Sequence, residues 1–160
     1  MKGNYNSVKN EKMKKNIFIP IISSVLILLW AYAALSKLID YQTFGLQLKL
    51  QPLPSWSIPV LKIGLPVMEL IIAVLLFTQK TQLFGLKVSM VLLVAFTLYV
   101  AIALSGTFGN IPCSCAGIIS ALKWKGHLIF NLCFTIINGY GLYLHSHSHD
   151  IRINEFTQKV

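Results

Sequence analysis

Four long apolar stretches, each almost free of charged side chains, alternate with polar segments along the chain. They cover residues 17–36, 58–77, 83–104 and 127–145. Each is close to the roughly 20 residues that a helix needs to cross about 30 Å of hydrocarbon. Because lipid offers no partners for exposed backbone N–H and C=O groups, we expect helices rather than strands. The pattern predicts an all-α fold, a four-helix transmembrane bundle in up-down-up-down order.

The same pattern predicts one membrane domain with a tail at either end. We expect the domain to cover residues 17–145, after a basic N-terminal tail (1–16) and before a C-terminal tail (146–160). The alternative for the first stretch is a cleavable signal peptide, because the basic start and Ala31-Tyr32-Ala33 resemble one. The apolar run is long for a signal peptide, and it places Trp30 near the outer interface, where tryptophan is favoured. We therefore expect this stretch to span the membrane.

The composition agrees with a membrane protein. The 160 residues are 55% hydrophobic and only 12% charged, with a mean hydropathy of +0.66. Soluble domains carry about 25% charged residues, so an ordinary water-soluble globule is excluded. The net charge is +9, but no basic patch is interleaved with exposed aromatic residues, so no nucleic-acid partner is expected. The partner predicted from these cations is the surface of the lipid bilayer.

Lysine and arginine are unevenly divided between the two sides of the predicted bundle. One side carries Lys2, Lys9, Lys12, Lys14, Lys15, Lys80, Lys87, Arg152 and Lys159. The other side carries Lys37, Lys49, Lys123 and Lys125. The positive-inside rule therefore places both termini in the cytoplasm and the loops 37–57 and 105–126 outside. In a bacterium this describes a multi-pass protein of the inner (plasma) membrane with two periplasmic loops.

The first outer loop contains a second helical signal. Apolar residues, including Tyr41, Phe44 and Leu48, are spaced among polar ones between Asp40 and Leu50. Such a segment is typical of a short helix that lies in the membrane interface. The two prolines of Gln51-Pro52-Leu53-Pro54 are expected to end it.

Two of the three cysteines, Cys113 and Cys115, lie in the second outer loop, in the sequence IPCSCAGII. Outside the cytoplasm thiols meet an oxidising compartment. Cysteines two residues apart bond only across a sharply bent backbone, and strained disulfides are the easily reduced, catalytic or regulatory ones. Nearby Lys123, Lys125 and His127 favour the thiolate. We predict a thiol–disulfide exchange site, with a permanent disulfide or two inert thiols as the alternative.

A metal site is the third possibility for these cysteines. The pair and His127 supply three ligands at an unusual spacing, whereas a structural zinc site needs four. We therefore predict no metal.

The fourth apolar stretch carries a polar stripe. At about 100° per residue, His127, Asn131, Thr135 and Asn138 fall within roughly 80° of one another, so they are expected to face the bundle interior. Cys133 lies on another side of the helix, and we expect it to be a small packing residue. Asn131 and Asn138 are candidates for cofactor binding or for interhelical hydrogen bonds. His127, at the outer mouth, is a candidate acid or base for thiol chemistry.

Glu69 is the most costly residue in the apolar stretches. A carboxyl group near the bilayer midplane is either protonated or paired. Lys62 precedes it by two turns, but its side chain leans toward the outer surface. We expect Asn138, at a similar depth, to be the partner of Glu69. The carboxyl group is a candidate proton relay or part of a site for a membrane quinone.

The chain resembles the MauE/DoxX group of small bacterial membrane proteins, and most closely the methylamine-utilisation MauE family. The resemblance rests on four segments, which are Leu35-Ser36-Lys37-Leu38-Ile39-Asp40, Pro66-Val67-Met68-Glu69, Pro112-Cys113-Ser114-Cys115, and Trp124 with His127, Phe130 and Asn131. It runs from about Trp30 to Leu144 and departs from the usual pattern at Ala116. Such proteins resemble a four-helix fold also found in vitamin K epoxide reductase, a quinone-linked thiol oxidoreductase.

The resemblance implies a role in maturation or redox upkeep of a disulfide-bearing periplasmic partner, as in methylamine dehydrogenase maturation. The family name is not evidence that methylamine is metabolised. We expect Cys113 and Cys115 to exchange disulfides with the partner, and a membrane quinone or another membrane carrier to re-oxidise or re-reduce the pair. A non-enzymatic membrane anchor or scaffold, and a soft-metal-binding membrane protein, are the alternatives.

Overall fold

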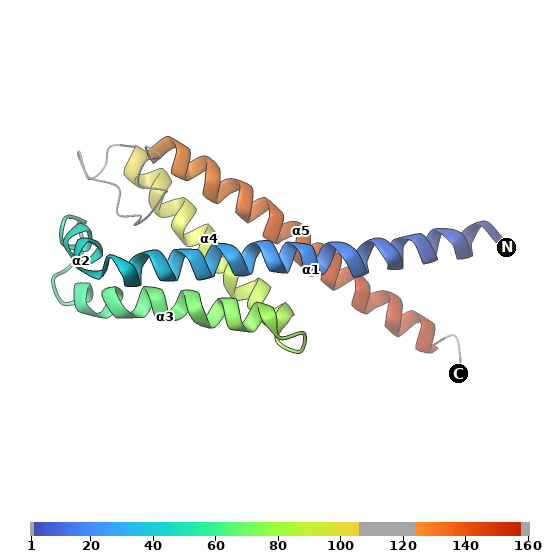
Figure 1. The fold of residues 1–160 in the computed structure, drawn as a ribbon. Helices are drawn as coiled ribbons and strands as arrows, with labels where there is room; N and C mark the ends of the chain where they lie inside the picture. Colours follow the sequence, from blue (N-terminus) through green and yellow to red (C-terminus); the bar gives the residue numbers. More distant parts are fainter. Residues whose placement is uncertain (1, 106–123, 158–160) are drawn as a thin grey trace.

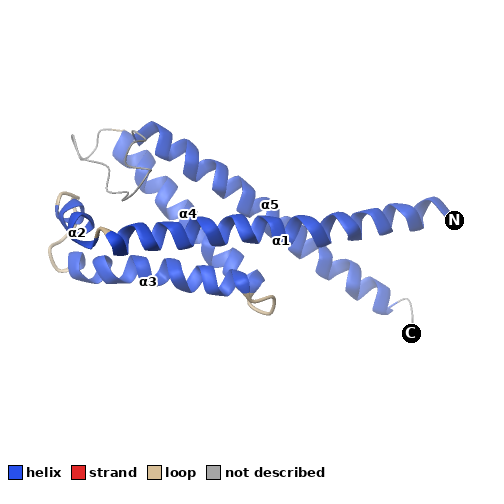
Figure 2. Ribbon diagram, in the orientation of Figure 1, coloured by secondary structure: helices blue, strands red, loops and turns tan. Residues whose placement is uncertain are grey.

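The computed structural model describes the backbone of residues 2–105 and 124–157, and the side chains of residues 17–105 and 125–146. Within these ranges the protein is entirely helical, without a strand (Figure 2). The helices are α1 (Lys2–Ile39), α2 (Tyr41–Lys49), α3 (Ser57–Phe77), α4 (Gln82–Leu104) and α5 (Trp124–Thr157). The all-α prediction is confirmed.

The four long helices run in alternating directions, as predicted (Figure 1). Helix α1 packs most extensively on α3, and α4 packs on α5, while α1 also contacts α5. The beginning of α1 and the end of α5 lie toward the same end of the bundle, and α2 lies at the other end. The bundle is therefore an up-down-up-down arrangement with an additional short helix at one end.

Each long helix contains a segment long and apolar enough to cross a bilayer. In the described chain there are four such segments, Ile17–Ile39, Ser57–Phe77, Gln82–Leu104 and Lys125–Ser146. They overlap the four predicted stretches, and the first continues three residues beyond the predicted end at Ser36. Large apolar side chains such as Leu28, Val60, Val91 and Ile136 are exposed on the outside of these helices. That exposure suits a surface that faces lipid rather than water.

The interior of the bundle is mainly aliphatic. Its buried cluster includes Ile22, Leu26, Ile72, Leu76, Leu86 and Leu93. At the turn between α3 and α4, a Cβ added to Gly85 would lie 3.0 Å from the backbone nitrogen of Leu76 and 3.1 Å from the carbonyl carbon of Leu75. Backbone atoms cannot move aside as a flexible side chain can, so glycine allows this close approach.

A buried hydrogen-bond cluster joins three of the helices at Ser89 on α4. The indole Nε1 of Trp30 donates to Ser89 Oγ at 2.9 Å, and Asn138 Nδ2 donates to the same oxygen at 2.9 Å. Asn138 Nδ2 also lies 3.2 Å from the backbone oxygen of Leu86. Trp30 is only 2% exposed. Trp30 is therefore buried inside the bundle, and the expectation that it lies near the outer interface stays a prediction.

The predicted short helix is present as α2, and it packs against the ends of α1 and α3. Its inner side buries Phe44, Gly45 and Leu48. Lys62 of α3 reaches back over this helix, with its Nζ 3.7 Å from the centre of the Tyr41 ring. A Cβ on Gly45 would lie only 2.7 Å from Lys62 Cε, so the glycine leaves room for the lysine side chain. Helix α2 is therefore part of the bundle and not only an interfacial element.

Candidate functional site

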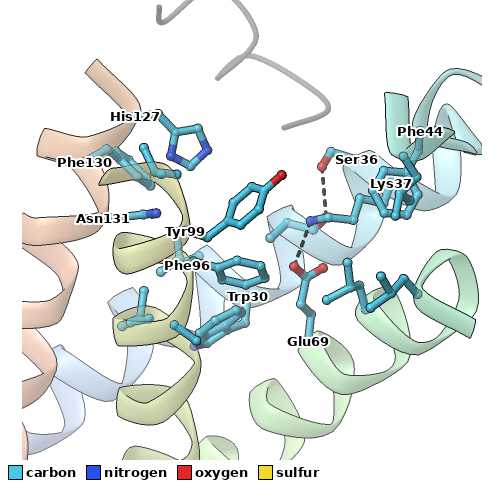
Figure 3. A pocket seen from close by; sticks show the side chains of 18 of the residues that line it. Trp30, Ser36, Lys37, Phe44, Glu69, Phe96, Tyr99, His127, Phe130 and Asn131 are labelled. Carbon is cyan, nitrogen blue, oxygen red and sulfur yellow. Dashed lines mark hydrogen bonds and ion pairs between the residues drawn. The ribbon is translucent and has the colours of Figure 1, made fainter. Parts of the chain in front are cut away.

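A cavity of about 350 Å³ lies among α1, α2, α3, α4 and α5. Its lining comes from the last turns of α1 and α4 and the first turns of α3 and α5, so it lies at the end of the bundle where α2 is found. Most of the wall is apolar or aromatic, including Trp30, Phe96 and Phe130 (Figure 3). Cavities of this size and character are typical of small-molecule sites.

On one side of the cavity, Lys37 of α1 pairs with Glu69 of α3. Lys37 Nζ lies 2.7 Å from Glu69 Oε1 and 3.1 Å from the backbone oxygen of Ala33. The same ammonium group lies 5.9 Å from the centre of the Phe44 ring. The second carboxylate oxygen, Glu69 Oε2, is buried and has no hydrogen-bond partner among the described residues. The ion pair explains how a carboxyl group is tolerated inside an apolar bundle.

This geometry corrects the expected partner of Glu69. The predicted partner, Asn138, instead bonds Ser89 and Leu86. Lys37 was assigned to the outer loop because the apolar run ends at Ser36. Helix α1 in fact continues to Ile39, and this carries the Lys37 side chain to the interior. Lys62 does not pair with Glu69, as expected, because its ammonium group lies over Tyr41.

On the opposite side of the cavity, α5 presents part of its polar stripe. His127 and Asn131 are each 6% exposed, and both line the cavity. His127 Nδ1 and Asn131 Nδ2 are buried without a hydrogen-bond partner in the described part of the chain. Thr135, one turn further along α5, is half-buried, and its Oγ1 donates to the backbone oxygen of Asn131. The prediction that the stripe faces the interior is confirmed.

Two other α5 residues lie elsewhere. Asn138 is fully buried in the Ser89 cluster and does not line the cavity. Cys133 is exposed, so the expectation that it is a packing residue is wrong. Because Cys133 lies on the side of the helix away from the polar stripe, it faces outward. The structure thus brings His127, Asn131 and Glu69 to one cavity and leaves Asn138 outside it.

Several lining residues were missed by the sequence reasoning. Besides Lys37, they include Tyr99 of α4, whose hydroxyl donates a hydrogen bond to Gln51 Oε1 in the segment after α2. Tyr99 lies within a long apolar stretch, where an aromatic residue is equally suited to facing lipid. For Lys37, the signal that could have found it is its position directly after an apolar run, in Leu35-Ser36-Lys37.

The proposed exchange pair, Cys113 and Cys115, lies outside the described residues. The chain leaves α4 after Leu104 and enters α5 at Trp124, and both of these helix ends lie at the cavity end of the bundle (Figure 1). Across residues 17–105 and 125–146, whose side chains the structure describes, no group of three or more His, Cys, Asp or Glu residues is placed to hold a metal ion. The cavity therefore offers hydrogen-bonding and charged groups rather than a metal centre within those residues.

Comparison with protein-family models gives a match to the methylamine utilisation protein MauE over residues 15–144. The chain belongs to the MauE family. The match covers the first three apolar segments, all but the last two residues of the fourth, and every residue that lines the cavity. Neither the curated proteins nor the solved structures gave a significant match. With four helices able to span a bilayer and this family membership, the chain is a multi-pass membrane protein.

Proposed function

We propose that this MauE-family protein exchanges disulfides with a periplasmic partner through Cys113 and Cys115. In this proposal the protein lies in the bacterial inner membrane, with the cavity end toward the periplasm. The observation that carries the proposal is the Cys-Ser-Cys sequence between α4 and α5, inside the region matched by the family. The uneven distribution of lysine and arginine supports the orientation.

The exchange step balances within the two proteins. One thiolate of the reduced pair attacks a disulfide of the partner, forming a mixed disulfide and releasing one partner thiolate. The second cysteine then attacks the mixed disulfide. The products are a Cys113–Cys115 disulfide and a dithiol in the partner, and the reverse reaction oxidises the partner. His127, in the first turns of α5, is proposed to accept and return the proton of the attacking thiol.

Trapping of the mixed disulfide tests the exchange. Cys113→Ser and Cys115→Ser are expressed separately in the full chain, and cells are quenched in acid and alkylated. We expect one of the two variants to accumulate a reducible adduct with a periplasmic protein, because its resolving thiol is missing. Cys133→Ser serves as the matched control, because Cys133 is an exposed cysteine of α5 outside the proposed site.

The same variants separate the alternative functions. A membrane anchor or scaffold predicts no adduct and unchanged maturation of the partner in both variants. A soft-metal-binding protein predicts metal in the purified wild type that is lost in both variants. Either result contradicts the exchange proposal.

A further inference from the structure

The cavity at the α2 end has two polar sides separated by aromatic side chains. Figure 3 shows Asn131 on one side and the Lys37–Glu69 pair on the other, with Phe96 and Tyr99 between them. Almost all of the remaining wall is apolar. A charged solute would lose its hydration in such a space without full compensation. The walls therefore suit a neutral molecule with a flat ring.

Two polar atoms without a hydrogen-bond partner in the described part of the chain define which groups the ring must carry. Asn131 Nδ2 is a hydrogen-bond donor, and its side chain points into the cavity from α5. Glu69 Oε2 is an acceptor on the opposite side, in a residue that is only 1% exposed. A buried polar group without a partner is unfavourable, so an occupant is expected to satisfy both. The occupant needs an acceptor at one end and a donor at the other.

Lys37 fixes the acceptor role of Glu69. Its ammonium group holds Oε1 at 2.7 Å and leaves Oε2 as the unpaired oxygen. A carboxylate held in this way accepts hydrogen bonds and cannot donate one. Lys37 is thus a positioning residue for the acceptor side.

We propose that this cavity binds the ring of a lipid-soluble quinol, with one ring oxygen at Asn131 Nδ2 and the opposite hydroxyl group at Glu69 Oε2. A hydroquinone ring carries an oxygen at each end, and each oxygen can accept or donate a hydrogen bond. The walls of the cavity are those that an uncharged aromatic ring requires, and the outside of the bundle is apolar enough to lie among lipid tails. Binding does not depend on the cysteines.

The redox role of the bound quinone, as the electron acceptor of the cysteine pair, rests on the proposed exchange function. Oxidation of the Cys113 and Cys115 thiols to a disulfide releases two electrons and two protons. Reduction of a quinone to its quinol takes up two electrons and two protons, so the two half-reactions balance without a further reactant. His127 lies on the Asn131 side of the cavity, where its unpaired Nδ1 is placed to pass protons.

Binding is tested with the purified full-length protein in nanodiscs. Decylubiquinol, kept reduced under anaerobic conditions, is titrated and followed by calorimetry. We expect saturable binding that decanol, which has the chain but no ring, does not compete away. Asn131→Leu removes the donor at nearly constant volume and is expected to weaken binding about tenfold. Thr135→Val, an isosteric change one turn away and outside the cavity, is the matched control.

The acceptor side is tested by removing both charges together. Replacing a buried ion pair by apolar residues is often neutral for stability. The double variant Lys37→Met/Glu69→Leu is therefore expected to fold and to bind decylubiquinol about tenfold more weakly. A second measurement, the thermal unfolding of each variant without quinol, identifies any variant that has lost its fold.

Three results would overturn the quinol site. They are the absence of saturable binding, unchanged affinity in both folded variants, and equal competition by decanol, which would mean that the cavity holds only water or lipid chains. The Cys113→Ser/Cys115→Ser double variant separates this proposal from the exchange function. Binding must persist in that variant. Absence of a mixed disulfide in both single-cysteine variants, with quinol binding intact, contradicts the exchange function alone. A trapped mixed disulfide without saturable quinol binding contradicts the quinol site alone.

Discussion

Lys37 and Glu69 form an ion pair between α1 and α3, with 2.7 Å between Nζ and Oε1. Both side chains are largely buried, with 12% of the lysine and 2% of the glutamate exposed. The pair joins the two helices that pack most extensively on each other, beside a cavity with further polar atoms that have no partner among the described residues. It is therefore both a structural contact and the electrostatic centre of the candidate site.

The first prediction concerns the removal of one partner of this pair. Lys37→Met leaves the Glu69 carboxylate buried without a counter-charge, and we expect a loss of about 3–5 kcal/mol in the free energy of unfolding. The double variant Lys37→Met/Glu69→Leu should recover most of that loss. The measurement is reversible unfolding in mixed micelles. A single variant as stable as the wild type would show that the pair contributes nothing to the fold.

The second prediction concerns the Ser89 cluster. Ser89→Ala removes the common partner of Trp30 Nε1 and Asn138 Nδ2, and we expect a loss of about 1–3 kcal/mol because a buried donor is left unpaired. Trp30→Phe removes that donor. It should therefore lower the free energy of unfolding less in the Ser89→Ala background than in the wild type. Additive losses in this double-mutant cycle would contradict the hydrogen bond.

The third prediction concerns the contact of Lys62, on α3, with helix α2. Gly45→Ala places a Cβ only 2.7 Å from Lys62 Cε, so the lysine must move away from the Tyr41 ring. We expect a loss of about 0.5–2 kcal/mol, the range of a cation–π interaction. Amide hydrogen exchange should become faster in residues 41–49.

Gly64→Ala is the matched control for that change. An added Cβ at Gly64 meets nothing within 4 Å, and alanine stabilises a helix interior by roughly 0.5–1 kcal/mol relative to glycine. Equal effects of the two substitutions would show that Lys62 does not need the space at Gly45.

The fourth prediction concerns orientation. On whole cells after mild reduction, a membrane-impermeant thiol reagent should label Cys113 and Cys115. It should leave Cys133 unlabelled, because that thiol is exposed on a helix face expected to lie against lipid. The labelled peptides are identified by mass spectrometry. Labelling of the pair by a permeant reagent only would place these cysteines on the cytoplasmic side and remove the basis of periplasmic exchange.

The helices could be predicted from the sequence because hydropathy and length alone determine which segments can span a bilayer. The inward stripe of α5 could also be predicted, because His127, Asn131 and Asn138 are related by the geometry of a single helix. These predictions require no knowledge of how one helix is rotated against another.

Contacts between helices could not be predicted in the same way. Depth suggested Asn138 as the partner of Glu69, but depth does not specify which faces meet, and the Glu69 side chain faces α1 instead. The boundary of a span matters equally. Three additional helical residues after Ser36 are enough to move Lys37 from a loop to the interior. The outward direction of Cys133 follows from the same helical geometry that places the polar stripe of α5 inward. A buried role was nevertheless predicted for its small side chain.

The tight turn at Gly85 has a consequence at the far end of the molecule. The end of α3 and the beginning of α4 are almost in backbone contact there, and Figure 1 shows the two helices diverging toward α2. The cavity, which these two helices line together with α1, α2 and α5, lies toward the end where they are far apart, and a single residue without a side chain lies where they are close. A bulkier residue at position 85 would push α3 and α4 apart at their close end and would change the width of the cavity many turns away.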